Sequence, residues 1–421
     1  MSSRAEGVIP KALELLKVYP LCDRCLGRLF AHYGVGLSNV TRGRALKTLL
    51  AMEIYRRISA GELGVINDLK LIAPNAGYPL NKLYEKFVGK LQQVRKCAVC
   101  GGRLEILIGK LISDALSRLE GVDSRTFVVG VKAGSKIEFR ETVIAEEFSL
   151  TSWESVRREV KREVGKKIQG LRAILPDFKE PDIVILVDLD NESVDLKIMP
   201  LYLGGTYLKI GRFMPQGRGR GISLVNVISK GLLKMLRGEN LKMLTPFIEP
   251  SDVRLLGGGG PIIVKVVEPR IRYVDLAELS KAASYEPWVL VSFNEAHNTF
   301  KVFWDEPRIQ RVSRVLIYVS EGISDDDVRS IEKSFTNIEV KQVLLRRLPN
   351  NRYKEITRSG MVYEVRGRKL TANIGEFLIR CSKSVLIRGL ITGENRSSPS
   401  FSSVICKEVK VLFLDVLGYT T

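Results

Sequence analysis

The sequence has no apolar run long enough to cross a membrane, no secretory signal and no lipidation motif. A membrane-spanning helix needs about 20 consecutive apolar residues, so we expect no membrane-embedded segment. No repeat of fixed period stands out either. We therefore expect a soluble, cytoplasmic protein. Its 421 residues are enough for two or three domains with cores of their own.

Acidic residues are in the minority. The chain has 47 Asp and Glu against 66 Lys and Arg, which gives a formal net charge of +19 and an isoelectric point near 9.6. Such an excess favours a polyanionic partner, above all nucleic acid. A well-solvated basic surface with no such partner would have the same composition, so the charge alone leaves both interpretations open.

Cysteine is scarce, but four of the six cysteines form two Cys-x-x-Cys pairs. The pairs are Cys22 with Cys25 and Cys97 with Cys100. Two residues between thiols let one tight turn point both sulfurs at one ion, so the pairs together predict a structural Zn²⁺ site. The alternative is two unrelated redox or buried pairs. The two remaining cysteines stand alone in apolar surroundings and are expected in the core: Cys381 and Cys406.

The patterns along the chain predict three regions, at residues 1–120, 121–200 and 201–421. The first is mostly helical, because apolar residues recur at helical spacing over 10–18, 41–60 and 104–119. In the helix at 41–60, the expected apolar stripe is Leu46, Leu49, Leu50 and Ile54. The cysteine pairs flank this helical block, so a metal ion would tie its start to its middle.

The sequence pattern of the second region predicts an α+β module. Strands over 126–131 and 182–188 flank a helix over 153–168, and 194–199 is the expected hairpin partner of the second strand. The helix is strongly basic, with Arg157, Arg158, Lys161, Arg162, Lys166 and Lys167. These cations either contact RNA phosphates or form a solvated face with pairs such as Glu163–Lys167.

The sequence pattern of the third region predicts a larger α+β domain. We expect residues 203–207 to form a turn between strands and residues 385–391 to form one of the last strands of the sheet. A basic, Gly-rich stretch at 211–221 is too flexible for a helix. Its arginines, Arg212, Arg218 and Arg220, either follow phosphates or belong to a mobile loop of no special role.

Several motifs, in this order, resemble the archaeal-type tRNA pseudouridine-54/55 synthases, the tenth pseudouridine synthase class. Leu21–Phe30 and Cys97–Gly102 are similar to the two halves of that family's zinc site, and Val40–Ala45 follows the first half as in the family. Residues 181–188 and 200–209 resemble the join from an accessory THUMP-like domain into the catalytic domain. Residues 252–261 resemble the family's catalytic strand-loop-strand.

The resemblance implies an α+β fold. Its parts are a helical zinc-stapled N-terminal region, a THUMP-like RNA-binding module and a C-terminal pseudouridine-synthase-like mixed or antiparallel sheet flanked by helices. It also implies that the chain isomerises uridines 54 and 55 in the T loop of tRNA, with structural Zn²⁺ and no redox or group-transfer cofactor. The target base leaves its stack and enters a pocket. No protein partner can be inferred.

In this family an aspartate acts at the ribose, as nucleophile or as base, and a nearby cation holds it in its charged form. The family carries Gly-Arg-Glu-Asp just before Val-Asp-Val-Arg, and the last residue of the quartet is that aspartate. With Asp252-Val253-Arg254 in register, Pro250 occupies its position. Proline offers no side-chain nucleophile. If the segment is extended, Asp252 lies on the same face as position 250, and Glu249 lies on the opposite face.

Asp252 is therefore the expected catalytic carboxylate of an active enzyme, with Arg254 or Arg212 as the cation that keeps it ionised. Two tyrosines that the family places at the substrate align with Phe300 and Leu386 of this chain. Phenylalanine keeps the aromatic ring, whereas leucine loses it. The expected substrate-binding residues are thus Phe300, Leu386, Arg254 and Arg212. Phe300 is otherwise an ordinary core residue of its strand.

Three hypotheses remain open. The chain is an active tRNA pseudouridine synthase with a displaced carboxylate, or a catalytically silent tRNA-binding paralogue. The third is a zinc-stapled RNA-binding protein whose resemblance reflects the fold alone. A turnover assay on T-loop RNA separates the first hypothesis from the other two, and chemical mapping of a bound tRNA separates the second from the third.

Overall fold

The computed structural model describes residues 7–151, 153–217, 221–246, 248–299, 309–347 and 353–420. The chain divides into two compact units, Met1–Lys197 and Ile198–Thr421, each of which is described by itself. The predicted division at residue 120 falls inside the first unit and stays a prediction. Among the described residues, no helix is both long and apolar enough to cross a membrane.

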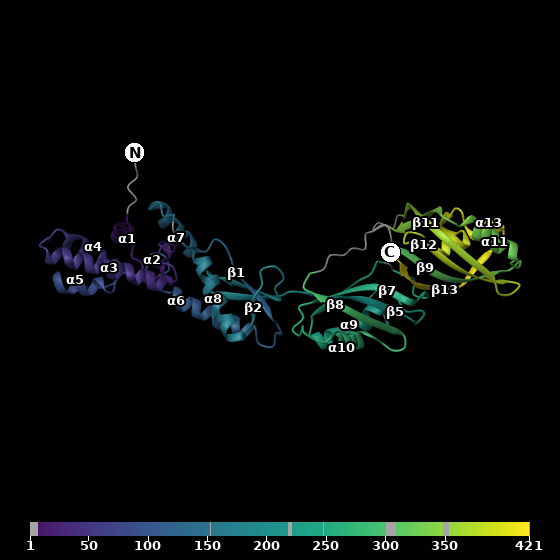
Figure 1. The fold of residues 1–421 in the computed structure, drawn as a ribbon, viewed down its shortest axis with the longest axis horizontal. Coiled ribbons are helices and arrows are strands. Elements are labelled where there is room, and N and C mark those ends of the chain that lie inside the picture. Colours follow the sequence, from purple (N-terminus) through teal and green to yellow (C-terminus); the bar gives the residue numbers. More distant parts are fainter. Residues whose placement is uncertain are drawn as a thin grey trace, which may run out of the picture. The chain divides into compact units, whose positions relative to one another are not determined.

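The first unit begins with helices (Figure 1). They are α1 (Val8–Val18), α2 (Asp23–Leu29), α3 (Asn39–Ser59), α4 (Val65–Ala76), α5 (Leu80–Phe87) and α6 (Leu104–Arg118). The predicted helical region is confirmed, although the sequence patterns missed α2, α4 and α5. The apolar stripe of α3 buries Leu46, Leu50 and Ile54 as predicted, whereas Leu49 is 45% exposed.

Helices α2 and α3 cross at very close range because glycine occupies both contact points. A Cβ atom on Gly27 would lie 1.8 Å from the carbonyl oxygen of Asn39, and one on Gly43 would lie 1.8 Å from that of Asp23. Any side chain at either position would push the helices apart. The crossing therefore holds the start of α2, which carries the first cysteine pair, against α3.

A four-stranded sheet in the order β2–β1–β3–β4 completes the first unit. Its elements are β1 (Thr126–Val131), α7 (Lys136–Glu147), α8 (Val156–Arg172), β2 (Leu175–Pro176), β3 (Ile183–Asp188) and β4 (Ser193–Ile198). Helix α8 packs on β1 through one fully buried face of Val156, Val160, Val164 and Ile168. The predicted strand, basic helix and strand pair are confirmed, and α7 was missed.

The second unit is built on one mixed sheet with nine strands in the described residues. The strands are β5 (Leu201–Lys209), β6 (Asn240–Leu244), β7 (Arg254–Val267), β8 (Val289–His297), β9 (Gln310–Val319), β10 (Ile338–Arg347), β11 (Tyr353–Lys369), β12 (Ile374–Ser382) and β13 (Val409–Thr420). Their order is β10–β11–β12–β9–β13–β7–β5–β8, with β6 paired to β7. Strands β13 and β7 pair in parallel, while the neighbouring pairs β13–β9 and β5–β7 are antiparallel.

Helices cover this sheet and close its core. They are α9 (Leu224–Leu236), α10 (Leu276–Ala283), α11 (Asp325–Ser334), α12 (Ile387–Thr392) and α13 (Phe401–Ile405). Helix α10 packs on β8, α11 on β11 and α12 against β13. One continuous cluster of buried apolar side chains draws on all of these parts. The predicted sheet flanked by helices is thus confirmed.

Two local predictions in this unit are wrong. Residues 203–207 belong to β5 and do not form a turn. Glycine occurs there because a Cβ atom on Gly205 would lie 2.0 Å from the carbonyl oxygen of Ser292 on β8, so the strand needs a bare backbone at that point. Residues 387–392 form α12 and not a strand, because a short apolar run does not distinguish the two by its pattern.

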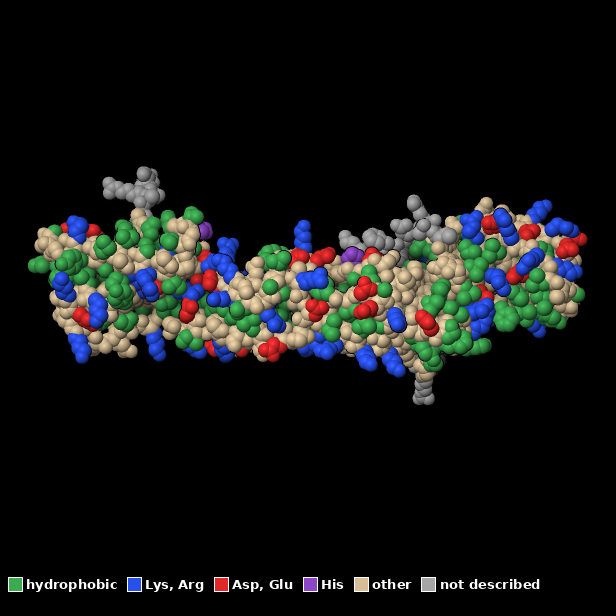
Figure 2. Space-filling view, turned by 60° about the horizontal axis from the view of Figure 1, so that its bottom comes forward, with side chains coloured by type: hydrophobic (Ala, Val, Ile, Leu, Met, Phe, Trp, Pro, Cys, Tyr) green, Lys and Arg blue, Asp and Glu red, His purple; other side chains and the backbone are tan. Residues whose placement is uncertain are grey.

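Figure 2 shows how charge is distributed on one face of each unit. Lys and Arg side chains are spread over the visible surface, with Asp and Glu side chains among them. The basic excess therefore does not collect into one continuous patch on this face. On this face, a preferred contact with a polyanion would come from local groups of cations.

Candidate functional site

Four thiols meet between α2 and α6. Cys22 is the N-cap of α2 and Cys25 lies in its first turn, while Cys97 and Cys100 lie just before α6. Their sulfur atoms lie within 4.8 Å of one another, and those of Cys22 and Cys100 are 3.7 Å apart. Tetrahedral coordination with metal–sulfur bonds of about 2.3 Å places the sulfurs about 3.8 Å apart. The cluster therefore fits one tetrahedral metal ion, as the paired spacing predicted.

The backbone around the cluster also suits a metal. Gly101 and Gly102 follow the second pair with φ of +64° and +81°, a conformation that glycine adopts without strain. The backbone N–H of Cys25 donates to the sulfur of Cys22 at 3.5 Å. Of the two other cysteines, Cys381 is buried as predicted. The core prediction for Cys406 is wrong, because this residue ends α13 with an exposed side chain.

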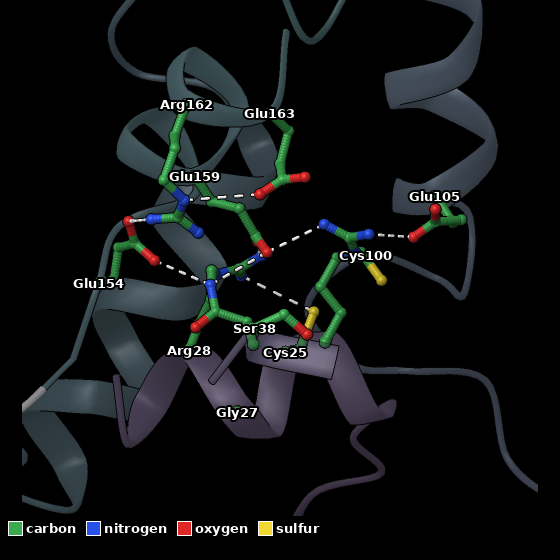
Figure 3. Close-up of polar contacts among 12 residues, drawn as sticks. Cys25, Gly27, Arg28, Ser38, Cys100, Glu105, Glu154, Glu159, Arg162 and Glu163 are labelled. Atoms are coloured by element: carbon green, nitrogen blue, oxygen red, sulfur yellow. Dashed lines mark hydrogen bonds and ion pairs between the residues drawn. The ribbon is translucent and has the colours of Figure 1, made fainter. Parts of the chain in front are cut away.

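A buried arginine links the thiol cluster to helices α7 and α8 of the first unit (Figure 3). Arg28 of α2 is 1% exposed, and its guanidinium lies 3.7 Å from the sulfur of Cys25. It pairs with Glu141 of α7 at 2.6 Å and with Glu159 of α8 at 3.2 Å. Arg24 pairs with the same Glu159 at 3.0 Å. Buried charges persist only when paired, so these contacts fix α2 to α7 and α8.

In the second unit, the segment aligned with the family's catalytic motif is a turn and not an extended strand. The N–H of Val253 donates to the carbonyl oxygen of Pro250 at 3.1 Å. Fully buried Lys209 donates from Nζ to the carbonyl oxygens of Met214, Pro250 and Ser251 at 3.1, 3.0 and 3.2 Å. Burial lowers the pKa of Lys209 to about 8. This side chain holds the turn in place just before β7.

The turn directs two carboxylates to different arginines. Glu249 is buried and pairs with Arg311 of β9 at 2.8 Å. Asp252, whose side chain is 34% exposed, pairs with Arg388 of α12. The carboxylate of Asp252 is thus partly exposed and beside a guanidinium, whereas that of Glu249 is almost completely buried and held by Arg311.

The two arginines that we expected beside the carboxylate of Asp252 pair with another aspartate. Arg212 and Arg254 contact Asp415 of β13 at 2.6 and 2.7 Å. Arg212 contacts Asp252 through the backbone carbonyl oxygen, at 2.7 Å. Burial alone would raise the pKa of Asp415, but the hydrogen bond from Arg254 and the charge of Arg212 lower it below its usual value. Arg212 therefore braces β13 against the turn, and Arg254 joins β13 to the start of β7.

A cavity of about 650 Å³ opens beside the turn. It is lined by Pro246, Ile248, Glu249, Arg311, Arg358, Ser359, Lys383, Ser384, Val385 and Leu386. The predicted residue Leu386 is part of this wall. Its N–H donates to the side-chain oxygen of Gln342 at 2.8 Å, and the Gln342 amide donates back to its carbonyl oxygen at 2.9 Å. Phe300 lies outside the described residues. The cavity has the size of a small-molecule site.

Sequence reasoning did not single out Arg311, Lys209 or the role of Arg388. Arg311 stands in an alternating strand pattern, Gln310-Arg311-Val312, in which a cation is expected to face water. Its burial depends on Glu249, a partner 62 residues away. Arg388 had a signal, since it follows Leu386 within the aligned motif, but nothing local connected it to Asp252.

Two family models match the chain. The model described as the C-terminal part of Pus10 matches residues 202–419, and the model described as the archaeal Pus10 THUMP domain matches residues 111–188. The first match covers the second unit almost entirely. The second covers β1, β2 and β3 of the four-stranded sheet with α7 and α8, and ends before β4.

Relatives called tRNA pseudouridine synthase Pus10 match nearly end to end. That of Thermosphaera aggregans is 32% identical over 97% of this chain and 96% of its own length, and that of Aeropyrum pernix is 32% identical over 97% of each. A chain in a crystal structure of the archaeal box H/ACA sRNP Nop10–Cbf5 complex is 10% identical, with a TM-score of 0.27, over 50% of this chain and 46% of its own. A structural likeness this weak carries no argument. The sequence matches confirm the resemblance: the chain belongs to the Pus10 family.

Proposed function

We propose that this protein is a tRNA pseudouridine synthase that isomerises uridines 54 and 55 of the T loop. Its full-length similarity to relatives of that name supports a uridine in tRNA as the substrate. The observation that carries the proposal is the partly exposed ion pair of Asp252 with Arg388. Neither residue lines the cavity of about 650 Å³, but Glu249 of the same loop and Leu386 at the start of the same helix do. Breaking a glycosidic bond by this route needs an accessible carboxylate with a cation beside it.

The chemistry requires one carboxylate and no external reactant. The carboxylate of Asp252 takes the C2′ proton of the ribose while the C1′–N1 bond breaks, and the electron pair of that bond stays on the uracil. The uracil turns, and its C5 then bonds to C1′ as the carboxylic acid returns its proton to C2′. The proton that C5 carried moves to N1, so product and substrate have the same atoms. The cavity would hold the base in an unstacked position during this turn.

The turn at Pro250 removes an objection to this assignment. Along an extended strand, a shift of two residues would move the carboxylate by about 6–7 Å. Here the N–H of Val253 bonds back to the carbonyl oxygen of Pro250, so the chain reverses within four residues. Asp252 therefore lies nearer to the position that Pro250 occupies than it would along an extended strand. Arg388, and not Arg254 or Arg212, is the cation beside this carboxylate.

We also propose that Cys22, Cys25, Cys97 and Cys100 hold a structural Zn²⁺ ion. Four thiolates at tetrahedral spacing are the donor set that zinc prefers in structural sites. The ion would stabilise the fold and take no part in the reaction. Modification of tRNA in this way is consistent with a cytoplasmic protein.

The second candidate function is a catalytically silent tRNA-binding paralogue. Proline at the family's aspartate position and the loss of a ring at Leu386 favour it. Both candidates predict tRNA binding, so only turnover separates them.

The test is a single-turnover assay on an unmodified tRNA transcript, with pseudouridine mapped by primer extension after carbodiimide treatment. We expect wild-type protein to modify the T loop, and Asp252→Asn to lose at least about 100-fold in rate while it still binds tRNA. Asp326→Asn, an equal change at a highly exposed pair on α11, is the matched control and should react normally. Wild-type protein that binds tRNA but forms no pseudouridine establishes the silent paralogue.

A further inference from the structure

A second cavity, of about 480 Å³, lies in the first unit beside the thiol cluster. Its walls include three of the four thiols, those of Cys22, Cys97 and Cys100. The starts of α2 and α6, helix α3, the turn between α4 and α5, and the segment before Cys97 form the rest. The catalytic chemistry proposed above does not use this cavity. Its volume is within the range of small-molecule and nucleotide sites.

The walls of this cavity are tied together by contacts that keep it open in one shape. The Nζ of Lys47 on α3 donates to the carbonyl oxygen of Ala76 at 2.7 Å. The N–H of Arg95 donates to the carbonyl oxygen of Pro74 at 2.8 Å. The cavity is therefore preformed, and a ligand would not have to order it.

The acidic side chains in the lining already have cationic partners. Asp23 pairs with Lys47 at 2.8 Å and with Arg44 at 3.2 Å. Glu105 pairs with Arg24. These carboxylates therefore do not neutralise the remaining cations of the lining.

Two cations of the lining remain for an external anion. Arg95 and Lys96 are exposed and pair with no carboxylate in the part of the chain that the structure describes. The guanidinium of Arg95 donates to the neutral side-chain oxygen of Asn75 at 3.3 Å. Neither residue contacts a cysteine sulfur, whereas Arg28 does. Among the described residues, the two side chains are therefore not held by a hydrogen bond to the cluster.

An exposed aromatic ring stands in the same lining. Tyr78 is 68% exposed, and neighbouring Val94 is 42% exposed. A Cβ atom on Gly77 would lie 3.3 Å from a methyl carbon of Val94, so the segment with Tyr78 and the segment with Arg95 lie against each other. An exposed ring beside unpaired cations is the arrangement that single-stranded nucleic acids use, with bases stacked on rings and phosphates on cations.

We propose that this cavity binds an unstacked nucleotide of the tRNA, with its base on the ring of Tyr78 and the adjacent phosphates on Arg95 and Lys96. The proposal rests on tRNA as the substrate proposed above, and it adds an RNA contact on the metal-binding side of the first unit. This contact recognises RNA by stacking and charge and takes no part in the chemistry.

The test measures tRNA affinity by fluorescence anisotropy at several salt concentrations. We expect Tyr78→Ala to weaken binding about 5- to 150-fold, the usual cost of losing one stacked base. Arg95→Glu/Lys96→Glu should weaken binding and reduce the slope of log K against log salt by roughly 1.5 for two lost phosphate contacts. Metal content and melting temperature should stay as in the wild type, because all three side chains are exposed.

The matched control is Arg329→Glu/Lys333→Glu on α11, which makes the same change in net charge at exposed positions. If it weakens binding as much as the Arg95/Lys96 variant, the effect is general electrostatics and the proposal is wrong. A Tyr78→Ala protein with wild-type affinity overturns the proposal as well, and would leave the surface to a protein partner. Binding is read without turnover, so this result is separate from that of the proposed activity.

Discussion

The carboxylate of Glu249 lies 2.8 Å from the guanidinium of Arg311, and both side chains are almost completely buried. Arg311 also donates to the carbonyl oxygen of Val385 at 2.6 Å, and the hydroxyl of Tyr419 donates to Glu249 at 3.2 Å. Burial and the charge of Glu249 raise the pKa of Tyr419 above its usual range, so it stays a neutral donor. This network joins the loop before β7 to the segment that carries Leu386, and so joins two walls of the cavity.

Breaking this pair from one side should destabilise the protein. Glu249→Gln leaves the guanidinium of Arg311 buried without a counter-charge, which costs about 3–5 kcal/mol. Glu249→Gln/Arg311→Met removes both charges and should recover most of that loss. Denaturant unfolding of the two variants checks this, and Asp326→Asn at an exposed pair should leave stability unchanged. A Glu249→Gln protein as stable as the wild type would show that the pair is not a brace.

Zinc should be present at one ion per chain, and its removal should destabilise the first unit. Metal binding to four thiolates contributes directly to folding free energy. We expect the Cys97→Ser substitution and, separately, treatment of the wild type with a strong chelator to lower the melting temperature by similar amounts. Cys381→Ser, at a buried cysteine outside the cluster, is the control for loss of a thiol and should keep its zinc. Elemental analysis without zinc, or an unchanged melting temperature of Cys97→Ser, contradicts the prediction.

The sequence predicted those features that depend on local spacing. The spacing of the two Cys-x-x-Cys pairs predicted the four-thiol cluster. The apolar residues at helical spacing in α8 correspond to the face that packs on β1. What it missed depends on partners far along the chain. Glycines in β5 resembled a turn because the strand that approaches them, β8, lies about 90 residues later. The same holds for Arg388, whose carboxylate partner Asp252 is 136 residues away. Such pairs follow from the fold and not from any local pattern.

The stability of the second unit should rise with pH above pH 8 through Lys209. The folded-state pKa of about 8 lies below the ordinary value of 10.5. Between these values the folded protein has released the proton while the unfolded chain keeps it, so the unfolded state binds more protons and rising pH favours folding. The cost of the buried charge is fully present below pH 8. The unfolding free energy of the wild type minus that of Lys209→Met should therefore rise by up to about 1.4 kcal/mol per pH unit.

This pH dependence is best measured between pH 8 and 9.5. Burial raises the pKa of Tyr207. At higher pH, this tyrosine ionises in the unfolded chain before it does in the folded protein, which lowers the unfolding free energy as pH rises. Between pH 6 and 7.5, the difference in unfolding free energy between wild type and Lys209→Met should stay constant. A difference that stays constant up to pH 9.5 would mean that Lys209 keeps its proton in the folded state.

The basic face of α8 should contribute to tRNA binding through its exposed members. Arg157 and Arg162 pair with Glu138 and Glu154, whereas Arg158 and Lys166 are exposed. Arg158→Glu/Lys166→Glu should weaken tRNA binding and lower the salt slope by roughly 1.5. The matched control is the α11 charge reversal at Arg329 and Lys333, compared in the same salt titration. Equal affinities and slopes would instead identify the helix as a solvated face.

Arg388 should affect the rate of the reaction more than the affinity for tRNA. Its guanidinium pairs with the carboxylate of Asp252, and both groups are partly exposed, so the pair is available to a bound ribose. In Arg388→Met the carboxylate loses the adjacent cation, and we expect the single-turnover rate to fall at least about tenfold at saturating tRNA. Arg388→Lys keeps a positive charge without the planar fork and should retain part of the rate. Arg254→Met, at an arginine bound to Asp415, is the comparison that separates a contact with Asp252 from bracing of β13. If Arg388→Met only weakens binding and keeps the full rate at saturation, Arg388 is a tRNA contact, and Asp252 must act without it.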